Sequence, residues 1–532
     1  MKDADAQRME KIVSLCKRRG FVFQSSEIYG GLNGVWDYGP LGVELKRNVK
    51  DYWWRVMVHE RDDVVGLDGA ILTHQDVLKA SGHVGGFADP MSTCKFCKRL
   101  IRFDQLREQV ALAPWARDLA AAIPPGGGAV SMNQLRDWAR GRGKKLAPNL
   151  ALVREPDTTL SWIVEESERH QPIDPWYFFQ LAATEQFKQT GPVNPCPYCG
   201  GELTPPRPFN LMFSTHMGAA TDESSVAYLR PETAQSIFVQ FKNVLEVSRK
   251  KLPFGIAQIG KAFRNEINPR NFTFRSREFE QMELEYFCRP EQGVELLEYW
   301  KEERLKFYEN IGLARERLHV KSVSDEERAF YSKGTYDIEY DFPFGRQELE
   351  GVAYRTDYDL SQHQKASGKP LEYFDEETKQ RFIPHVVEPS AGVDRTVLAL
   401  ICDAYTEDEA PDEKGKMETR TVLRFHPRVA PIKCGVFPLL KNNAQLVAKA
   451  KEIVDLLRPH MFVFYDESGA IGRRYRRQDE IGTPFCVTVD FETLGEKDRQ
   501  LRDTVTLRER DSMKQERVKI SELRELIAAR IA

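Results

Sequence analysis

The fold of this chain is predicted best from residues 256–287, which read IAQIGKAFRNEINPRNFTFRSREFEQMELEYF. The opening IAQIGKAF is short and apolar, as in a buried strand, and a loop rich in turn-forming residues follows it. The closing EFEQMELEYF alternates acidic and apolar residues, which is typical of a half-buried strand. We therefore predict a strand, a loop and a second strand that pair as a hairpin.

This hairpin concentrates charges of both signs: Arg264, Glu266, Arg275, Arg277, Glu278, Glu280, Glu283 and Glu285. Arginine forks match phosphate oxygens, and an aromatic ring such as Phe279 offers a stacking face for a base. The acidic run of Glu280, Glu283 and Glu285 would attract an ammonium group. The pattern thus suits the floor of a site for a nucleoside triphosphate and a cation. It equally suits an exposed ribbon whose charges pair across the strands.

Two later stretches favour the site. Residues 386–402 read VVEPSAGVDRTVLALIC, a strand end, a small-residue turn and then an apolar helix. Arg395 stands in the first turn of that helix, where the helix dipole disfavours a cation unless a bound anion compensates. In residues 347–355, Glu348 and Glu350 are predicted on one face of a strand, and paired carboxylates near phosphates suit Mg²⁺.

The same stretches resemble a known family. FRNE at 263–266 with RSREF at 275–279 resembles motif 2 of the class II aminoacyl-tRNA synthetases, and GVDR at 392–395 resembles their motif 3. The strings GFVFQSSEIYGG, WDYGPLGVELK, LRPETAQ, GKAFRNEINPRNF, FEQMELEYF and EPSAGVDR resemble the dimeric glycyl-tRNA synthetases. The resemblance implies an α+β fold with an antiparallel-sheet catalytic domain, an inserted zinc-ribbon-like module and a C-terminal α/β anticodon-binding domain.

Four segments follow from this reading. Residues 1–93 form the N-terminal part of the catalytic domain, 94–206 the inserted module, 207–428 the catalytic core with motifs 2 and 3, and 429–532 the anticodon-binding domain. A helix over 43–61 and a strand over 64–72 read alone as plain core. By resemblance they are motif 1, which implies a homodimer interface. The stretch 207–215 is predicted to be a strand that returns to the main sheet.

Composition sets broad limits. The chain has 532 residues, of which 30% are charged and 41% hydrophobic, and its net charge is −3. A nucleic-acid partner therefore requires a local basic patch. We expect no membrane segment, because no apolar run approaches about 20 residues. Nine cysteines without a secretory signal predict a reducing, cytoplasmic location.

Four of the cysteines form two CxxC turns, Cys94–Cys97 and Cys196–Cys199. Each turn presents two thiolates to one point, and a structural Zn²⁺ site takes four such ligands. The alternative is four buried free thiols. Between the turns, polar helices over 115–122 and 133–140 and a basic turn over 140–145 are predicted.

From Pro431 the pattern alternates strand and helix, which predicts a small domain with a mostly parallel sheet. The run RRYRR at 473–477 lies on its second helix. Such a run is either a solvated face or, beside Tyr475, a contact surface for RNA. The resemblance to anticodon-binding domains favours RNA.

Upstream of the hairpin, residues 227–241 predict a strand end, a Pro-Glu turn and a helix that Thr233 caps. From the residues alone, Glu232 is either a favourable charge at the helix start or part of a site. By resemblance it grips the substrate ammonium with Glu283 and Glu388.

The resemblance implies a two-step reaction with ATP, glycine and tRNA(Gly) as partners and Mg²⁺ bound with ATP. Glycine first attacks ATP to give glycyl-adenylate and pyrophosphate, and the glycyl group then passes to the 3′ end of the tRNA. Arg264 and Arg395 are the implied catalytic residues. By resemblance Arg264 contacts the α-phosphate, and Phe279 with Arg395 sandwiches the adenine.

The implied ATP-binding residues are Arg264, Asn265, Glu266, Phe274, Arg275, Ser276, Arg277, Glu278, Phe279, Glu348, Leu349, Gly392, Val393, Asp394 and Arg395. The implied glycine-binding residues are Arg102, Glu232, Phe279, Glu280, Gln281, Met282, Glu283, Glu388, Pro389, Ser390, Ala391 and Gly392. Glu348 is the implied magnesium ligand. Two alternatives stay open: a class II synthetase for serine, threonine, proline or histidine, and a tRNA-binding paralogue without catalysis.

Overall fold

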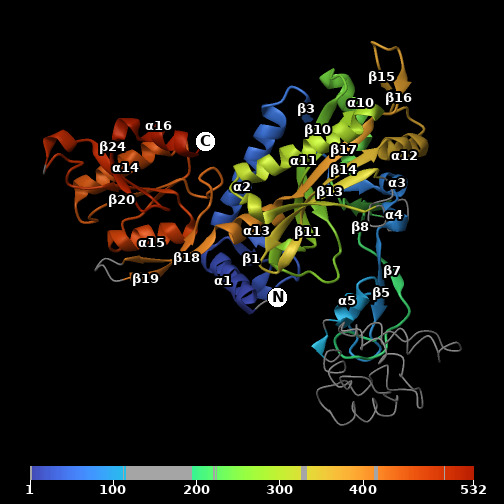
Figure 1. Ribbon diagram of the computed structural model, residues 1–532, viewed down its shortest axis with the longest axis horizontal. Coiled ribbons are helices and arrows are strands. Elements are labelled where there is room, and N and C mark those ends of the chain that lie inside the picture. Colours follow the sequence, from blue (N-terminus) through green and yellow to red (C-terminus); the bar gives the residue numbers. More distant parts are fainter. Residues whose placement is uncertain are drawn as a thin grey trace, which may run out of the picture. The chain divides into compact units, whose positions relative to one another are not determined.

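The computed structural model of the chain describes residues 3–111, 113–114, 195–219, 222, 225–324, 332–411, 417–496 and 498–531 (Figure 1). It divides into two compact units, one formed by residues 1–81 with 212–532 and the other by residues 82–211. The predicted helices over 115–122 and 133–140 and the basic turn after them lie outside the described residues.

The first unit is built on a seven-stranded sheet with the order β12-β13-β14-β17-β11-β10-β3. Every neighbouring pair is antiparallel except β10 and β3. The strands are β3 (Val64–Gly66), β10 (Phe254–Phe263), β11 (Glu278–Cys288), β12 (Leu318–Ser322), β13 (Gly334–Phe342), β14 (Gly345–Thr356) and β17 (His385–Gly392).

The predicted hairpin is confirmed, because β10 and β11 pair without a shift from Phe254 opposite Phe287 to Phe263 opposite Glu278. The alternation of β11 divides its side chains between the two faces of the sheet. Met282 and Leu284 join the large hydrophobic core on one face. Glu283 and Glu285, which are also buried, therefore belong to the opposite face.

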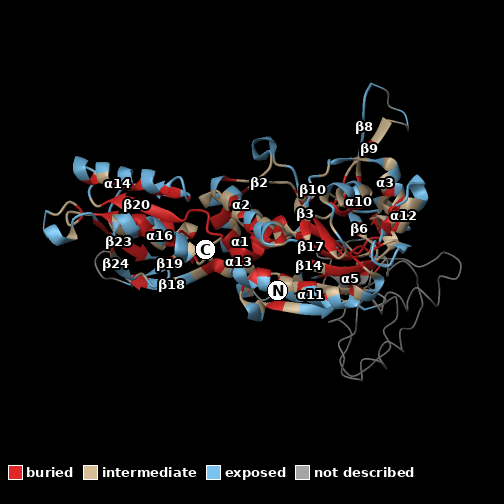
Figure 2. Ribbon diagram, turned by 90° about the horizontal axis from the view of Figure 1, so that it is seen from above, coloured by how far each residue is buried: buried red, intermediate tan, exposed pale blue. Residues whose placement is uncertain are grey.

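Helices cover the apolar face of the sheet. They are α1 (Asp3–Arg19), α2 (Pro40–Trp54) with a π-helical turn (Arg55–His59), α11 (Gly293–Asn310) and α13 (Val393–Ala404). Their largest buried side chains include Trp53, Trp300 and Tyr308, which pack into one continuous core with strands β11, β14 and β17. Figure 2 shows the buried segments in red running through β14, β17 and α13.

The opposite face is only partly covered. Helices α10 (Ala234–Ser248) and α12 (Tyr358–Ser367) pack on it through a smaller apolar cluster that includes Phe238, Phe241 and Leu360. Beyond this cluster the same face bears the polar side chains of the candidate site.

Shorter elements surround the sheet in the first unit. They are β1 (Val22–Gln24), β2 (Trp36–Tyr38), β4 (Leu72–His74), α3 (Gln75–Ala80), β8 (Phe213–His216), β9 (Val226–Leu229), β15 (Tyr373–Phe374) and β16 (Arg381–Phe382). The strand expected over 64–72 is interrupted, because β3 ends at Gly66 and β4 joins a separate sheet with β9 and β8. Between them the backbone N–H of Gly69 donates to the Gln258 side chain, and a Cβ at Gly69 would lie 2.5 Å from Ser236 Oγ.

The C-terminal part of the first unit is the predicted α/β domain. Its sheet has the order β21-β20-β22-β23-β24, and its elements are β20 (Cys434–Pro438), α14 (Ala444–Leu457), β21 (Val463–Tyr465), α15 (Ile471–Ile481), β22 (Phe485–Val489), β23 (Thr504–Glu509), β24 (Gln515–Lys519) and α16 (Ile520–Ile531). The three parallel strands are confirmed. The antiparallel hairpin of β23 and β24 was not predicted from the sequence. Another hairpin, β18 (Tyr405–Pro411) with β19 (Met417–Leu423), precedes this domain.

The second unit contains a three-stranded sheet of β6 (Leu100–Arg102), β5 (Ala88–Thr93) and β7 (Arg207–Asn210), with helices α4 (His83–Gly86) and α5 (Leu106–Ala111). The single strand predicted over 207–215 is therefore wrong. Its first half pairs with β5 in this unit, whereas its second half is β8, which pairs with β9 in the first unit. Neither half joins the seven-stranded sheet.

Candidate active site

A pocket of about 380 Å³ opens on the polar face of the seven-stranded sheet. Sixteen of the predicted site residues line it: Glu232, Arg264, Glu266, Phe274, Arg275, Ser276, Phe279, Gln281, Glu283, Glu348, Leu349, Glu388, Ser390, Gly392, Asp394 and Arg395. Residues that the sequence did not single out complete the lining: Thr273, Val323, Thr335, Asp337, Gly351, Ala353 and Arg355. A volume of this size suits a small substrate.

One part of the pocket is cationic and aromatic. The Arg264 guanidinium lies 5.3 Å from the centre of the Phe279 ring, and its Nε donates to the Pro231 carbonyl at 3.0 Å. The strand pairing fixes this arrangement, since both residues stand at the loop end of the hairpin. Arginine beside an aromatic ring is suited to a nucleotide, because the ring stacks on the base and the guanidinium binds phosphate oxygens.

Arg395 reaches the same pocket from the first turn of α13. Its guanidinium lies 4.5 Å from the centre of the Phe274 ring, and its Nη1 donates to the Glu348 carbonyl at 3.1 Å. The Glu348 carboxylate is 3.4 Å from the same Nη1 and about half exposed. The ring next to Arg395 is thus Phe274, whereas the ring next to Arg264 is Phe279.

The loop between β10 and β11 is held by Arg277, which does not contribute to the described lining. Its Nε donates to the Glu266 carbonyl at 2.9 Å and its Nη1 to the Asn33 carbonyl at 2.6 Å. Close approach explains the neighbouring Gly34, because a Cβ there would lie 2.4 Å from the Pro269 ring. Arg275 lines the pocket and pairs with Glu266 at 3.3 Å.

Another part of the pocket is acidic and deeply buried. Glu283 is 1% exposed, and it accepts hydrogen bonds from Ser390 Oγ at 2.7 Å and from the Thr233 hydroxyl. Burial, followed by the charge of Glu232, raises the pKa of Glu283. Thr233 holds the N-cap position of α10, as predicted, but its side chain makes no capping hydrogen bond and donates to Glu283 instead.

Glu388 is held in the same part by Arg355, whose Nη1 donates to both carboxylate oxygens at 2.9 and 2.8 Å. The other nitrogens of Arg355 bind Asp359 at 2.8 and 2.9 Å. Burial and the neighbouring acids nevertheless raise the pKa of Glu388 to about 8. The sequence did not single out Arg355, because an arginine within a strand belongs to no recognisable motif.

Glu232 is oriented by a side-chain relay. Gln235 Nε2 donates to Glu232 at 2.9 Å and lies 3.2 Å from Asp359. Gln235 Oε1 in turn lies 2.8 Å from His363 Nε2. Gln235 lies three residues after Glu232. At this spacing the sequence alone does not distinguish a residue that orients Glu232 from one that only packs.

Several predicted site residues lie away from the pocket lining, and for Met282 and Ala391 the reason is that side chains alternate between the two faces of a strand. Met282, Ala391 and Val393 belong to the hydrophobic core, on the face that the helices cover. Glu278 pairs with Lys261 at 2.5 Å. Asn265 and Pro389 also stand outside the described lining.

Glu280 shares the core-facing side of β11 and pairs with Lys46 at 3.1 Å and Lys50 at 2.9 Å, both from α2. Asp394 accepts hydrogen bonds from Lys46 at 2.8 Å and from the Tyr38 hydroxyl at 2.6 Å. Burial alone would raise the pKa of Asp394, but Lys46 and these hydrogen bonds lower it. Through these ion pairs Glu280 connects α2 to the hairpin, and Asp394 connects α2 to α13.

The expectation that Glu348 and Glu350 share one face is wrong. The register of β13 and β14 shifts between Ile338 and Glu339, and the bulge turns Glu350 toward the helices. There Glu350 is 1% exposed and pairs with the fully buried Arg304 at 2.6 Å. Glu348 keeps its place in the pocket.

Arg102 lies in the second unit, where it pairs with Asp104 at 2.6 Å and Asp89 at 3.1 Å. Neither unit by itself tests the predicted contact of Arg102 with the substrate, which stays a prediction.

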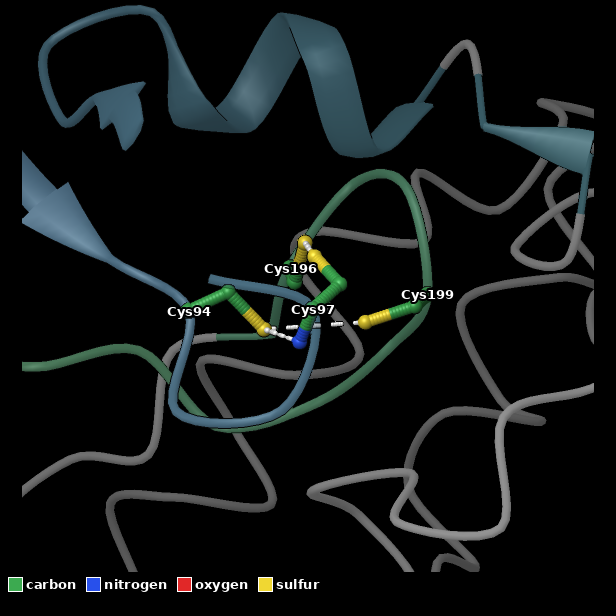
Figure 3. Close-up of side chains that lie close together, drawn as sticks. All are labelled: Cys94, Cys97, Cys196 and Cys199. Carbon is green, nitrogen blue, oxygen red and sulfur yellow. Dashed lines mark hydrogen bonds between the residues drawn. The ribbon is translucent and has the colours of Figure 1, made fainter. Parts of the chain in front are cut away.

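The four CxxC cysteines come together in the second unit, although 98 residues separate the two turns in the sequence. Figure 3 shows the four side chains converging on one point. Their sulfur atoms lie 3.6 Å apart for Cys94 and Cys199 and 3.7 Å apart for Cys97 and Cys196. Zn–S bonds of about 2.3 Å imply edges of about 3.8 Å for a tetrahedron, so the thiols fit a zinc ion.

The basic run on α15 is mostly engaged within the C-terminal domain. Arg474 is 2% exposed and donates to the carbonyls of Pro438, Leu439 and Gly469. Arg477 pairs with Asp466 at 2.5 Å. In this run Arg473 is exposed, so the predicted RNA surface would rest on it more than on its neighbours.

Comparison with known proteins agrees with this geometry. Residues 216–405 match the model of the tRNA synthetase class II core domain (G, H, P, S and T), and residues 433–530 match the anticodon binding domain. The predicted catalytic core and anticodon-binding domain are therefore confirmed. No helix among the described residues combines the length and apolar character that crossing a membrane requires.

Relatives of known function match along almost the whole chain. The glycine–tRNA ligase of Thermobifida fusca is 47% identical over 99% of this chain and 99% of its own length. The glycine–tRNA ligase of Rhodopirellula baltica is 46% identical over 98% of this chain and 99% of its own length. That of Thermus thermophilus is 46% identical over 99% of both. The chain belongs to the glycine–tRNA ligases, within the class II aminoacyl-tRNA synthetases.

Proposed function

We propose that the chain joins glycine to tRNA(Gly) at the expense of ATP, in two steps within the pocket on the seven-stranded sheet. One observation carries the proposal. A single pocket is lined by arginines with aromatic rings and, separately, by buried carboxylates, which suits a nucleotide beside the ammonium group of a small amino acid. The family of the relatives supports the same reaction.

In the first step the carboxylate of glycine attacks the α-phosphorus of ATP, and pyrophosphate leaves. The protein's contribution is positioning and charge stabilisation, as in other phosphoryl transfers. Arg264 would contact the α-phosphate and stabilise the negative charge that grows in the transition state. The position of Arg264 beside the Phe279 ring, directly after β10, supports this role.

The nucleotide would lie across the loop end of the hairpin. The adenine would stack on Phe279 against the guanidinium of Arg395, with Glu266 accepting a hydrogen bond from its amino group. Arg275 would bind the terminal phosphates. The current partner of Arg275 is Glu266, at 3.3 Å, so the two residues would separate when ATP binds.

Magnesium would accompany ATP, since class II synthetases use ATP with Mg²⁺. Glu348 fits as its protein ligand, because its carboxylate lines the pocket and is half exposed, and Asp337 offers a second carboxylate in the lining. When bound, the ion would neutralise phosphate charge. The arginines would still orient the α-phosphate.

Glycine would bind with its ammonium toward Glu232, Glu283 and Glu388. The hydroxyl of Ser390 and the backbone up to Gly392 would close the floor around the Cα atom. A pocket closed in this way would exclude amino acids with larger side chains.

In the second step the glycyl group would pass to the terminal ribose hydroxyl of the tRNA. The C-terminal domain would hold the anticodon region, as the match to anticodon-binding domains supports. We also propose a symmetric homodimer built through α2 and a cytoplasmic location. None of the nine cysteines forms a disulfide, in keeping with a reducing compartment.

We further propose that Cys94, Cys97, Cys196 and Cys199 bind a structural Zn²⁺. The sulfur separations support four-coordinate binding without a fifth ligand. Elemental analysis of the purified protein should give about one zinc per chain. A protein without bound metal, whose unfolding is unaffected by a chelator, would reject the zinc site while leaving the ligase reaction standing.

The test of the function is ATP–pyrophosphate exchange with each amino acid in turn, followed by charging of total tRNA. Glycine alone should support exchange, and one tRNA species should become charged. Exchange with serine, threonine, proline or histidine would favour another synthetase of the same class. Binding of tRNA without exchange would favour a paralogue that lacks catalysis.

A further inference from the structure

Glu285 is a buried acid directly behind the amino-acid part of the pocket. It stands two residues beyond Glu283 on β11, so both side chains project from the same face of the strand. The Glu285 side chain is fully buried, and neither of its carboxylate oxygens has a hydrogen-bond partner among the described residues. A buried carboxylate without a partner is costly, because charge is stabilised far better in water.

The Glu285 carboxylate lies close to two acids of the pocket. Carboxylate oxygens of Glu283, Glu285 and Glu388 all lie within 4.8 Å of one another. Three atoms so spaced surround a point within about 2.8 Å of each, the length of a hydrogen bond from an ammonium group to a carboxylate. Two of these acids line the pocket, and Glu285 extends their cluster into the protein.

The nearby cationic charge does not balance these acids. Arg355 donates to Glu388 and to Asp359, so its guanidinium is already divided between two carboxylates. Glu283 is stabilised by neutral hydroxyl donors. Arg230, a further cation that interacts with Glu283, donates to the backbone carbonyls of Lys261 and Gly69. Among the residues that the structure describes, the cluster thus holds more acid than base, which favours binding of a further cation.

We propose that Glu285 is a binding residue for the amino-acid substrate, whose negative charge acts on the glycine ammonium together with Glu283 and Glu388. This inference rests on the proposed function. The Glu285 carboxylate has no hydrogen-bond donor among the described residues. The ammonium of the bound substrate would stabilise its negative charge. Burial and the charge of Glu388 raise the pKa of Glu285 in the free protein, so the substrate would displace a proton from the cluster.

The test is the variant Glu285→Gln, which keeps the shape of a protonated acid but cannot carry the charge. The KM for glycine in ATP–pyrophosphate exchange should rise at least about tenfold, while the KM for ATP stays within about twofold. Glu285→Met removes the charge without leaving a buried polar group, and it should raise the KM for glycine likewise. The pH dependence of that KM should become shallower in both variants, a change that a packing role would not produce.

Glu350→Gln is the matched control. Glu350 is equally buried, but it faces the helices and pairs with Arg304. Its variant should lose thermal stability and keep the wild-type KM for glycine. If either folded Glu285 variant binds glycine as the wild type does, with the same pH dependence, this inference is overturned. If the wild-type protein itself shows no glycine-dependent exchange, the proposed function fails.

Discussion

Two buried acidic clusters in the first unit differ in how their charges are matched. In the C-terminal domain, the fully buried Asp479 accepts hydrogen bonds from Arg420 at 2.9 Å and from Arg508 at 2.8 and 3.0 Å. On the catalytic sheet, Glu285 is as deeply buried and has no hydrogen bond to the described residues. The first cluster is satisfied by the protein itself, whereas the second is not.

The difference indicates what each cluster is for. A matched cluster fixes the geometry of the chain, since removing one member leaves the others buried and unpaired. A cluster with surplus acid lowers the stability of the ligand-free protein and favours binding of a cation. Substitutions should therefore separate the two, with losses of activity at the catalytic pocket and losses of stability around Asp479.

The largest effect is expected for Arg264→Ala. Without this guanidinium the growing charge on the α-phosphate is unsupported, and the rate of glycine-dependent ATP–pyrophosphate exchange should fall by about three orders of magnitude. Circular dichroism and thermal unfolding should match the wild type. Arg458→Ala changes an exposed arginine directly after the end of α14; this variant serves as the control and should exchange normally. Exchange at the wild-type rate in Arg264→Ala would remove Arg264 from the mechanism.

Asp479→Asn should show the opposite pattern. Because two arginines lose a buried partner, the free energy of unfolding should fall by about 3–5 kcal/mol, measured by urea denaturation. Exchange per folded molecule should be unchanged. The exposed pair of Asp455 and Arg458 provides the contrast, since Asp455→Asn should cost less than about 1 kcal/mol. Equal losses in both variants would mean that the matched cluster is not what stabilises the domain.

Glu232→Gln should weaken glycine far more than ATP. The change removes one charge from the ammonium site but keeps the hydrogen bond to Gln235 within reach. The KM for glycine should rise by about one order of magnitude, and the KM for ATP should stay near the wild-type value. Glu295→Gln on α11 is a suitable control, because that acid lies in the first turn of a helix away from the pocket. A parallel rise in both constants would count against the ammonium role.

The smallest predicted effect is on the pH dependence of glycine binding. Burial raises the pKa of Glu388 from 4.5 to about 8 although Arg355 donates to both of its oxygens, so its carboxyl group ionises only in part at neutral pH in the free protein. The groups that act on it are Arg355, Glu283, Glu232, Glu285 and Asp359. Glycine binding favours the ionised form, so the KM for glycine should fall as pH rises toward about 8.

The raised pKa of Glu388 has the opposite consequence for folding stability, which falls as pH rises. The folded state keeps a proton that the unfolded state releases above pH 4.5, so the contribution of Glu388 to stability is fully present below that pH and is lost as pH rises through about 8. Adding glycine should offset the loss. A KM for glycine that is flat between pH 6 and 8 would show that the cluster is already ionised.

The sequence predicted the hairpin, the helix that begins near Arg395 and the alternating C-terminal domain, because local patterns of two and 3.6 residues determine them. It also grouped most residues that line the pocket, through motifs in the order typical of a family. It could not place Glu348 and Glu350 on opposite faces, because a bulge leaves no signature in the sequence.

The parts of the site that the sequence did not predict depend on contacts between residues far apart in the chain. Arg355 and Gln235 act through partners far away in the chain, and nothing adjacent to them marks that contact. Glu280 looked like its neighbour Glu283, yet strand alternation turned it toward Lys46 and Lys50. The hairpin of β23 and β24 was missed because short polar strands carry a weak pattern.

The most direct test of the account is a crystal structure of the protein with glycine and a non-hydrolysable ATP analogue. We expect the nucleotide between Arg264 and Arg395, and the glycine nitrogen within hydrogen-bond distance of Glu283 and Glu388, on the side of the cluster that Glu285 supports. Glycine bound elsewhere, or a nucleotide lodged away from both arginines, would contradict the proposal that unmatched buried acids mark the amino-acid site.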